Sequence, residues 1–363
     1  MIRRLPAGKA WAGRWHPELQ TASVEAYPGG GFWGTIRQRI SRGDEFRRVS
    51  LDHAKWLATA VACDLQKREG GLGDLFFSYD TTFLEPAELA RRLGTPAVLG
   101  QVDPGRLEAE LVREEALRWK GWEPVWEGGT AMNDYFDRQE AEWNVADRIV
   151  VNSQWSKELL VKQGVPPDRL TVIPLAFEPT NSKPNQPTAK SSAPLRVLWL
   201  GVVTLRKGFP YFLEAARRVP RAVAEFRVVG RIDVSEEAFR DLPAHVEIVG
   251  SVPREEVEEH YAWADIFAFP TLSDGFGMTQ LEAMDAGLPV ISTPCCGEVV
   301  VDGECGLRIP PRNGEALAEG VIRLSDDRNL LAQLQEGAKK RVSAFRLDAL
   351  GEGLKLLEGD IFS

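Results

Sequence analysis

Cysteine and histidine are scarce in this sequence of 363 residues, which contains four of each. They are Cys63, Cys295, Cys296, Cys305, His16, His53, His245 and His260. None of them has a partner at the spacing of a metal site or a catalytic triad, and two adjacent cysteines do not suit an ordinary disulfide framework. The sequence therefore predicts no bound metal and no disulfide scaffold. A reducing cytoplasm fits this cysteine usage.

Long apolar runs are also absent. No run approaches the roughly 20 residues that a membrane-spanning helix needs. The first thirty residues lack the apolar centre of a signal peptide. We therefore expect any contact with a membrane to be peripheral.

Positive charge is in deficit overall, and the net charge of -9 argues against general nucleic-acid binding. The charge is unevenly spread, because residues 1–50 contain nine Lys or Arg and four Asp or Glu, a local charge of +5. Two interpretations stay open for this basic region. It faces an anionic lipid or a lipid-linked acceptor at the inner face of a membrane, or it is an ordinary solvated surface.

The length and the order of the predicted elements indicate two α/β domains, because strands alternate with helices in both halves. Such alternation predicts parallel pairing and two doubly wound, Rossmann-like units with a cleft between them. The predicted strands are 74–79, 96–101, 148–152, 170–174, 196–200, 226–229, 246–249, 265–269 and 289–292. The predicted domains are 1–177 and 195–345, joined by a proline-rich linker at 178–194 and followed by a helical piece at 346–363.

Residues 270–291 carry the strongest functional signal. They begin after a predicted strand, pass through a glycine loop and enter a helix near Gly277. A glycine loop lets the backbone approach a ligand, and the first turn of the helix offers N–H groups to an anion such as a diphosphate. Asp274 and Glu282 would flank that anion and accept hydrogen bonds from hydroxyl groups. Diphosphate and hydroxyls together suggest a nucleotide sugar.

The same stretch resembles the signature of the family-4 retaining glycosyltransferases of the GT-B fold. In that signature two acids, separated by seven residues, surround a Gly-Phe-Gly turn. The resemblance implies that Glu282 binds the nucleotide ribose and that Asp274, where a Glu is more usual, lies beside the donor sugar. It also implies donor contacts from the loop and the helix start. These contacts would come from Gly275, Phe276, Gly277, Met278 and Thr279.

A second loop, 201–208, follows the strand 196–200 and contains Gly201, Arg206 and Lys207. Adjacent cations between a glycine turn and a helix start suit phosphate oxygens. The Arg-Lys-Gly triplet also matches the family, whose members use it on the donor diphosphate. Both loops follow strands of one predicted sheet, so we expect them to meet on one ligand. Asp274, Arg206 and Lys207 are therefore the expected catalytic residues.

Further candidates follow other strands. The resemblance places Arg231, Ser251 and Val252 near the nucleotide base, although ordinary turn chemistry explains Ser251 equally well. On the acceptor side, Tyr79, Asp80 and Asp103 follow strands of the first half. Asp80 also suits a cap or turn, and Asp103 precedes a proline and has turn character.

The predicted function is metal-independent transfer of a hexosyl or related sugar, with retention, from a nucleotide-diphosphate sugar to a saccharide or lipid-linked acceptor in polysaccharide biosynthesis. No cofactor and no nucleic-acid partner are expected. The beginning of the chain departs from the family, because residues 1–50 contain no convincing first strand followed by a glycine loop and a helix. A shortened first domain would favour a nucleotide-sugar-binding pseudo-enzyme or a partner subunit. Another GT-B enzyme, such as a sugar epimerase, is a further alternative.

Overall fold

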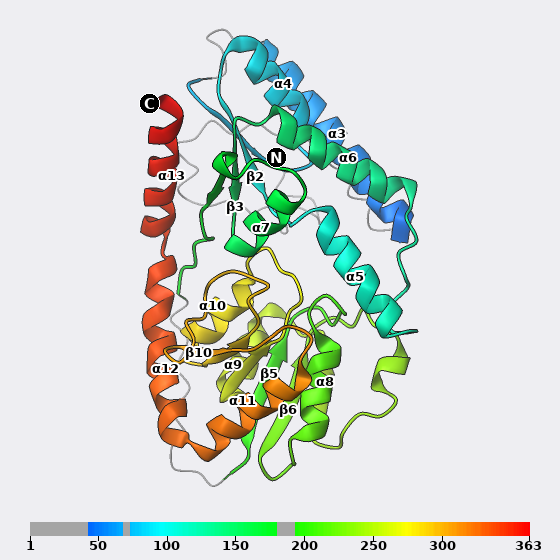
Figure 1. The fold of residues 1–363 in the computed structure, drawn as a ribbon, viewed down its shortest axis with the longest axis vertical. Helices are drawn as coiled ribbons and strands as arrows, with labels where there is room; N and C mark the ends of the chain where they lie inside the picture. The colour runs from blue at the N-terminus through cyan, green and yellow to red at the C-terminus, as the bar shows by residue number, and fades with distance from the viewer. Residues whose placement is uncertain (1–42, 68–72, 180–192) are drawn as a thin grey trace, which may run out of the picture.

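The structure is a computed structural model that describes residues 43–67, 73–179 and 193–363. The basic region and the beginning of the first domain fall largely outside these ranges, as does most of the predicted linker at 178–194. Within the described ranges, no helix combines the length and the apolar character that crossing a membrane requires. Figure 1 shows two α/β domains, one above the other.

The second domain is built on a six-stranded parallel sheet in the order β10-β9-β8-β5-β6-β7. Its strands are β5 Leu195–Leu200, β6 Ala224–Val229, β7 Val246–Gly250, β8 Ile266–Phe269, β9 Val290–Ser292 and β10 Gly306–Arg308. The sequence predicted the first five; β10 has only three residues, too few for an apolar pattern. The chain runs outward from β5 through β6 to β7, then returns to β8 on the other side of β5. The gap between β5 and β8 is therefore the topological switch point, where open α/β sheets bind ligands.

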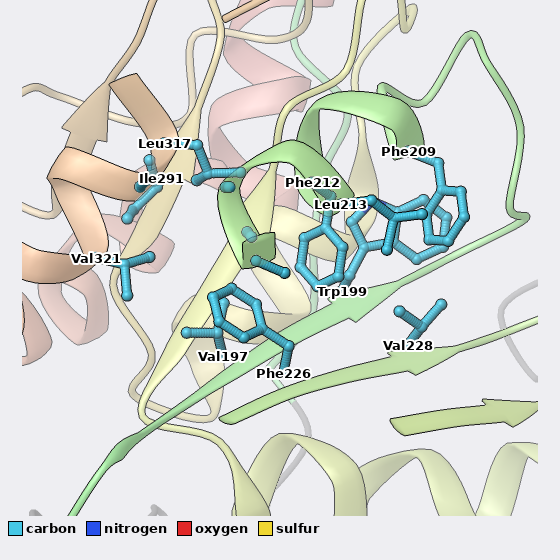
Figure 2. Packing of buried hydrophobic residues seen from close by; sticks show 14 of the residues in the cluster. Val197, Trp199, Phe209, Phe212, Leu213, Phe226, Val228, Ile291, Leu317 and Val321 are labelled. Atoms are coloured by element: carbon cyan, nitrogen blue, oxygen red, sulfur yellow. The ribbon is translucent and has the colours of Figure 1, made fainter. Parts of the chain in front are cut away.

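Helices cover both faces of this sheet. They are α8 Phe209–Arg218, α9 Val257–Trp263, α10 Met278–Asp285, α11 Gly314–Asp326 and α12 Arg328–Val342. On one face, Phe209 and Phe212 of α8 pack on Trp199 and Phe226 of the sheet, as Figure 2 shows. On the other face, Leu281 of α10 belongs to the second large apolar cluster of the domain. The two buried clusters hold the switch-point loops on a rigid frame.

The first domain has a four-stranded parallel sheet in the order β1-β2-β3-β4. The strands are β1 Phe76–Tyr79, β2 Ala97–Gln101, β3 Arg148–Val151 and β4 Leu170–Val172, and the helices are α3 Gly43–Gln66, α4 Leu84–Leu93, α5 Arg106–Arg118, α6 Thr130–Val145 and α7 Gln154–Lys162. Phe83, Trp143 and Leu160 pack on one face of the sheet. Ser153, expected to cap a helix, accepts a hydrogen bond from the Ser156 N–H at the start of α7. Single-turn 3-10 helices are η3 Pro167–Arg169, η4 Glu236–Phe239, η5 Arg254–Glu256 and η6 Ser343–Phe345.

The last helix, α13 Leu347–Phe362, leaves the second domain and covers the other face of the first sheet. Leu357 of this helix is buried with Val98, Val150 and Ile173. Because side chains alternate along a strand, Val98 and Val150 point away from the face that carries Leu99 and Ile149. The chain therefore crosses from the second domain back to the first.

Helix α5 makes another connection between the domains, and Figure 1 shows it running down toward the second domain. Ala116 and Trp122 are buried in the apolar cluster that contains Trp199 and Phe209. The ring of Trp119 meets the ring of Tyr211 on α8 edge to face, with centroids 6.0 Å apart. The end of α5 and the residues after it therefore pack on the second domain, although they lie within 1–177.

Candidate functional site

The loops that follow β5 and β8 pack directly against each other at the switch point. The Leu272 N–H donates to the Arg206 carbonyl at 2.8 Å, and the Arg206 guanidinium donates to the Ser273 carbonyl at 2.9 Å. Gly208 has φ +74°, and a Cβ there would lie 1.8 Å from the Pro270 carbonyl oxygen. Only glycine allows both this backbone conformation and this approach. The two loops thus form one continuous wall, as their positions after strands of one sheet predicted.

Both cations of the loop 201–208 form ion pairs with carboxylates. Lys207 forms an ion pair with Asp274, whose side chain is 15% exposed. Arg206 lies 3.6 Å from Glu108 of α5, measured from guanidinium nitrogen to carboxylate oxygen. The structure therefore brings all three expected catalytic residues together. An anionic ligand at these cations would compete with two carboxylates.

The N-terminus of α10 faces the same place. Gly277 takes the N-cap position with φ +86°, and no side chain caps the first turn. Among the described residues, no side chain accepts a hydrogen bond from the backbone N–H groups of Met278 and Thr279 at the start of the helix. Phe276 is only 3% exposed and its ring packs on Phe345, and its backbone N–H donates to Asp274 at 3.4 Å, so Phe276 supports the loop from within.

Glu282 lies about one turn into α10 and is half-buried. One of its carboxylate oxygens accepts a hydrogen bond of 2.9 Å from the Tyr261 hydroxyl. Burial, and after it the negative charge of Glu282, raise the pKa of Tyr261, so this hydroxyl stays a proton donor. The second oxygen of Glu282 has no hydrogen-bond partner among the described residues, which leaves it available to a ligand hydroxyl.

The remaining donor-side candidates lie along the same edge of the sheet, at the ends of β5, β6 and β7. A Cβ at Gly230 would lie 1.8 Å from the Gly201 carbonyl oxygen, so these two turns are in contact. Arg231 is largely exposed and pairs with Asp233 at 2.6 Å. Ser251 is exposed, whereas Val252 is half-buried against the second apolar cluster. The Arg231 carbonyl accepts a hydrogen bond of 2.8 Å from the Val203 N–H, so its backbone contacts the loop 201–208 while its side chain pairs with Asp233.

Two acids of the first domain, Asp80 and Asp103, meet in one polar cluster. The Gln139 amide donates to Asp80 at 3.3 Å and to Asp103 at 3.2 Å. The Tyr135 hydroxyl also donates to Asp103, and the Gln101 amide donates to Asp80 at 3.1 Å. Asp103 additionally accepts from the Gly105 N–H at 2.7 Å, which fits its expected turn character.

Tyr79 lies apart from this cluster. Its ring covers Gly100, where a Cβ would be 2.8 Å from the ring, and contacts Phe77 edge to face. Gly100 pairs with Val150, so Tyr79 is on the face of the sheet that α13 covers, and it is 56% exposed. The structure therefore separates Tyr79 from Asp80, although the two are adjacent in sequence.

Burial has a large effect on the pKa values of Asp80 and of the neighbouring Glu142. Burial, and after it the negative charges of Asp103 and Glu142, raise the pKa of Asp80 to about 8. Burial also raises the pKa of Glu142 to about 7, although the Thr81, Phe83 and Leu84 N–H groups donate to its carboxylate. Glu142 thereby holds the loop that connects Asp80 to α4.

The raised pKa of Asp80 predicts a pH dependence of stability. Between about pH 4 and pH 8 the folded chain binds more protons at this site than the unfolded chain, so the free energy of unfolding falls as the pH rises. We expect Asp80→Asn to remove the part of this fall that Asp80 contributes, so that the profile of the variant is flatter than that of the wild type. The variant should be more stable than the wild type by at least ~1 kcal/mol at pH 8, with the difference vanishing near pH 4.

Urea unfolding midpoints measured at intervals from pH 4.5 to pH 8.5 check this prediction. Asp134→Asn is the control, because Asp134 is an exposed carboxylate on α6, the helix that carries Gln139. Parallel pH profiles for the wild type and Asp80→Asn would contradict the prediction.

A pocket of about 990 Å³ opens beside these acids. Helices α3, α5 and α6 and residues 123–129 line most of it, and Thr204 and Asp233 of the second domain reach its edge. Its polar lining includes Asp103, Glu108 and Tyr135. Its apolar lining includes Leu51, Val112, Trp126, Met132 and Phe136. The pocket therefore lies next to the switch-point loops and could receive a second substrate.

Comparison with known proteins supports the assignment of the second domain. Residues 194–327 match the family described as "Glycosyl transferases group 1". The chain is 29% identical over 192 residues to the amylovoran biosynthesis glycosyltransferase AmsK of Erwinia amylovora, covering 49% of this chain and 47% of that protein. It is 26% identical over 228 residues to the putative colanic acid biosynthesis glycosyltransferase WcaL of Escherichia coli, covering 58% and 56%. The chain thus spans about half the length of these curated relatives.

Solved structures resemble most of the chain in fold. Sucrose-phosphate synthase from Thermosynechococcus elongatus has a TM-score of 0.64 and 20% identity, covering 86% of this chain and 79% of that one. HepE of Anabaena, in complex with UDP and glucose, has a TM-score of 0.62 and 17% identity, covering 93% and 98%. At these identities the likeness concerns the fold, and it confirms the predicted pair of Rossmann-like GT-B domains. The GT-B fold and the group 1 glycosyl transferase match over 194–327 together support a GT-B glycosyltransferase.

Proposed function

We propose that this chain is a retaining glycosyltransferase that moves a hexosyl or related sugar from a nucleotide-diphosphate sugar to a saccharide or lipid-linked acceptor. One observation carries the proposal. Arg206, Lys207 and Asp274 converge at the switch point beside the uncapped N-terminus of α10. This combination of two cations, free N–H groups and a carboxylate suits a diphosphate joined to a sugar.

The donor would lie along the carboxyl edge of the second sheet. The free oxygen of Glu282 is suited to a ribose hydroxyl, and the turns at Gly201, Arg231, Ser251 and Val252 would approach the base. HepE has been solved with UDP and with UDP-glucose. These complexes make UDP the first nucleotide to test with this chain.

The chemistry would need no metal and no cofactor, because the chain supplies its own positive charge. As the bond between the anomeric carbon and the diphosphate breaks, Arg206, Lys207 and the α10 N–H groups would stabilise the charge on the leaving oxygen. The acceptor oxygen would form its new bond on the same side of the sugar. Its proton would pass to the leaving phosphate. The signature acid Asp274 would lie beside the donor sugar, once the diphosphate competes for Lys207.

The acceptor would enter the 990 Å³ pocket, whose lining includes both polar residues such as Asp103 and apolar residues such as Trp126. This mixture suits a saccharide, or a saccharide on an apolar carrier. Relatives named for amylovoran and colanic acid biosynthesis make polysaccharide assembly the first process to examine. We extend the proposal to a cytoplasmic location, with peripheral membrane contact through the basic region 1–50.

Calorimetry with UDP, GDP and ADP, followed by product analysis with the matching sugar donors and a lipid-linked acceptor panel, tests the proposal. We expect Glu282→Ala to weaken nucleotide binding about 10- to 100-fold, because a carboxylate that accepts from ligand hydroxyls is lost. Tyr261→Phe is the matched control, since it removes only the internal partner of Glu282, and it should change affinity less than about threefold.

Each outcome has a separate meaning. Equal affinity of the wild type and Glu282→Ala would contradict the placement of the ribose. Nucleotide binding without transfer or hydrolysis of any donor would show a nucleotide-sugar-binding protein or partner subunit instead of an enzyme.

A further inference from the structure

Glu108 stands at the boundary between the acceptor pocket and the donor loops, and no sequence motif marks it. It lies in the first turn of α5 and lines the pocket, yet its carboxylate is 3.6 Å from the Arg206 guanidinium. The side chain is 17% exposed, and its Oε2 atom, the oxygen that faces Arg206, is buried and makes no hydrogen bond to the described residues. A buried carboxylate oxygen in this condition has unused capacity to accept a hydrogen bond.

The position of Glu108 relative to Arg206 is set by the anchoring of α5. Glu115, two turns further along, is fully buried and accepts from the Tyr211 hydroxyl at 2.6 Å. It also pairs with Arg312 at 2.6 Å. After the helix, Glu123 accepts from the Leu205 N–H at 2.5 Å, next to Arg206 itself. The pairing of Glu108 with Arg206 is thus built into contacts of α5 with the second domain, which hold both partners in place.

The charge of Glu108 depends on Arg206. Burial raises the pKa of Glu108, and the nearby negative charges of Asp103 and Asp274 raise it further. Arg206 opposes this effect most strongly. A ligand diphosphate that takes over Arg206 removes this main compensation, so Glu108 then needs another hydrogen-bond donor. Glu108 lines the pocket, so a hydroxyl group bound there can be that donor.

We propose that Glu108 forms an ion pair with Arg206 while the donor site is empty. Once a nucleoside diphosphate displaces Glu108 from Arg206, its carboxylate accepts a hydrogen bond from the acceptor hydroxyl in the pocket. This inference rests on the proposed function, and it makes Glu108 an acceptor-positioning residue that competes with the donor. It also predicts that the donor binds before the acceptor, because the Glu108 carboxylate becomes available to the acceptor hydroxyl only after the donor has bound.

The test is Glu108→Gln, which keeps the size of the side chain and removes its charge. UDP binding measured by calorimetry should tighten about 3- to 10-fold, because Arg206 loses its competitor. Transfer should fall about 10- to 100-fold in kcat/KM for the acceptor, mainly through acceptor KM. Glu110→Gln, an exposed carboxylate on the same helix, is the control and should change none of these values.

The outcomes separate this inference from the proposed function. Unchanged UDP affinity in Glu108→Gln, when the wild type binds UDP, overturns the inference and leaves the donor site intact. Tighter UDP binding with unchanged acceptor kinetics also overturns it, because Glu108 then only competes with the donor. A wild type that binds none of the three nucleotides overturns the proposed function, and the inference with it. Thermal unfolding of both glutamine variants confirms that the fold is retained.

Discussion

Replacing Lys207 by alanine should lower kcat/KM for sugar transfer by about 100- to 1000-fold, the range seen when one group that stabilises a developing negative charge is removed. Lys207 is the cation paired with Asp274. Without it, the leaving diphosphate loses a compact positive charge, and the Asp274 carboxylate stays uncompensated at a distance where it repels the phosphate. Nucleotide affinity should therefore fall together with the rate. Initial rates at several donor concentrations and calorimetry with UDP measure the two effects.

Arg240→Ala is the matched control for this experiment. Arg240 is a cation of the same domain, it is paired with Glu237, and its side chain is 71% exposed. Its loss should leave rate and affinity within about twofold, because an exposed ion pair contributes little. Equal losses in the two variants would indicate a general charge effect, and unchanged transfer in Lys207→Ala would contradict the placement of the diphosphate.

Replacing Gly208 by alanine should remove donor binding and lower the free energy of unfolding by about 3 kcal/mol or more. Two causes add up at this position. The backbone has φ +74°, which costs an L-residue about 1–2 kcal/mol. In addition, the new Cβ would lie 1.8 Å from the Pro270 carbonyl oxygen, so the loops after β5 and β8 would have to separate. Separation would move Arg206 and Lys207 away from Asp274.

Gly303→Ala isolates the first cause. Gly303 also has φ +74°, but a Cβ there would meet nothing within 4 Å. It should therefore cost only about 1 kcal/mol and leave UDP affinity unchanged. Urea unfolding and calorimetry on the two variants give the comparison. Similar losses of stability and normal UDP binding in Gly208→Ala would show that the contact between the two loops is dispensable.

The donor half of the site was predictable because its signals are local in the sequence. Residues 270–291 contain the end of a strand, a glycine loop and a helix start in succession, and β8 and α10 appear where this pattern predicted them. The loop 201–208 follows a strand in the same way. Parallel strands bring their carboxyl ends to one edge, so two such loops must become neighbours if their strands do. The pairing of β5 with β8 meets that condition.

The acceptor half was less predictable, because its residues come from helix surfaces. Glu108, Tyr135 and Gln139 lie in α5 and α6, where a polar residue usually indicates a solvated face. Their burial depends on how three helices pack around the pocket, which no local pattern reports. Tyr79 is the opposite case, a residue that the sequence placed in the site and the structure places outside it. It was expected on the acceptor side together with Asp80, but as the last residue of β1 it is turned away from Asp80 by the alternation of side chains along that strand.

The anchoring of α5 limits how far this protein can be divided into parts. The family match covers residues 194–327, which suggests a self-contained module for expression. In the intact chain, however, Trp122 packs on Phe209 and belongs to the apolar cluster of that module, and Trp119 covers Tyr211. A fragment that begins after the linker would expose this aromatic surface to water and to other copies of itself. A soluble donor-binding fragment would therefore need residues 106–125 supplied with it, as a fused or co-expressed peptide.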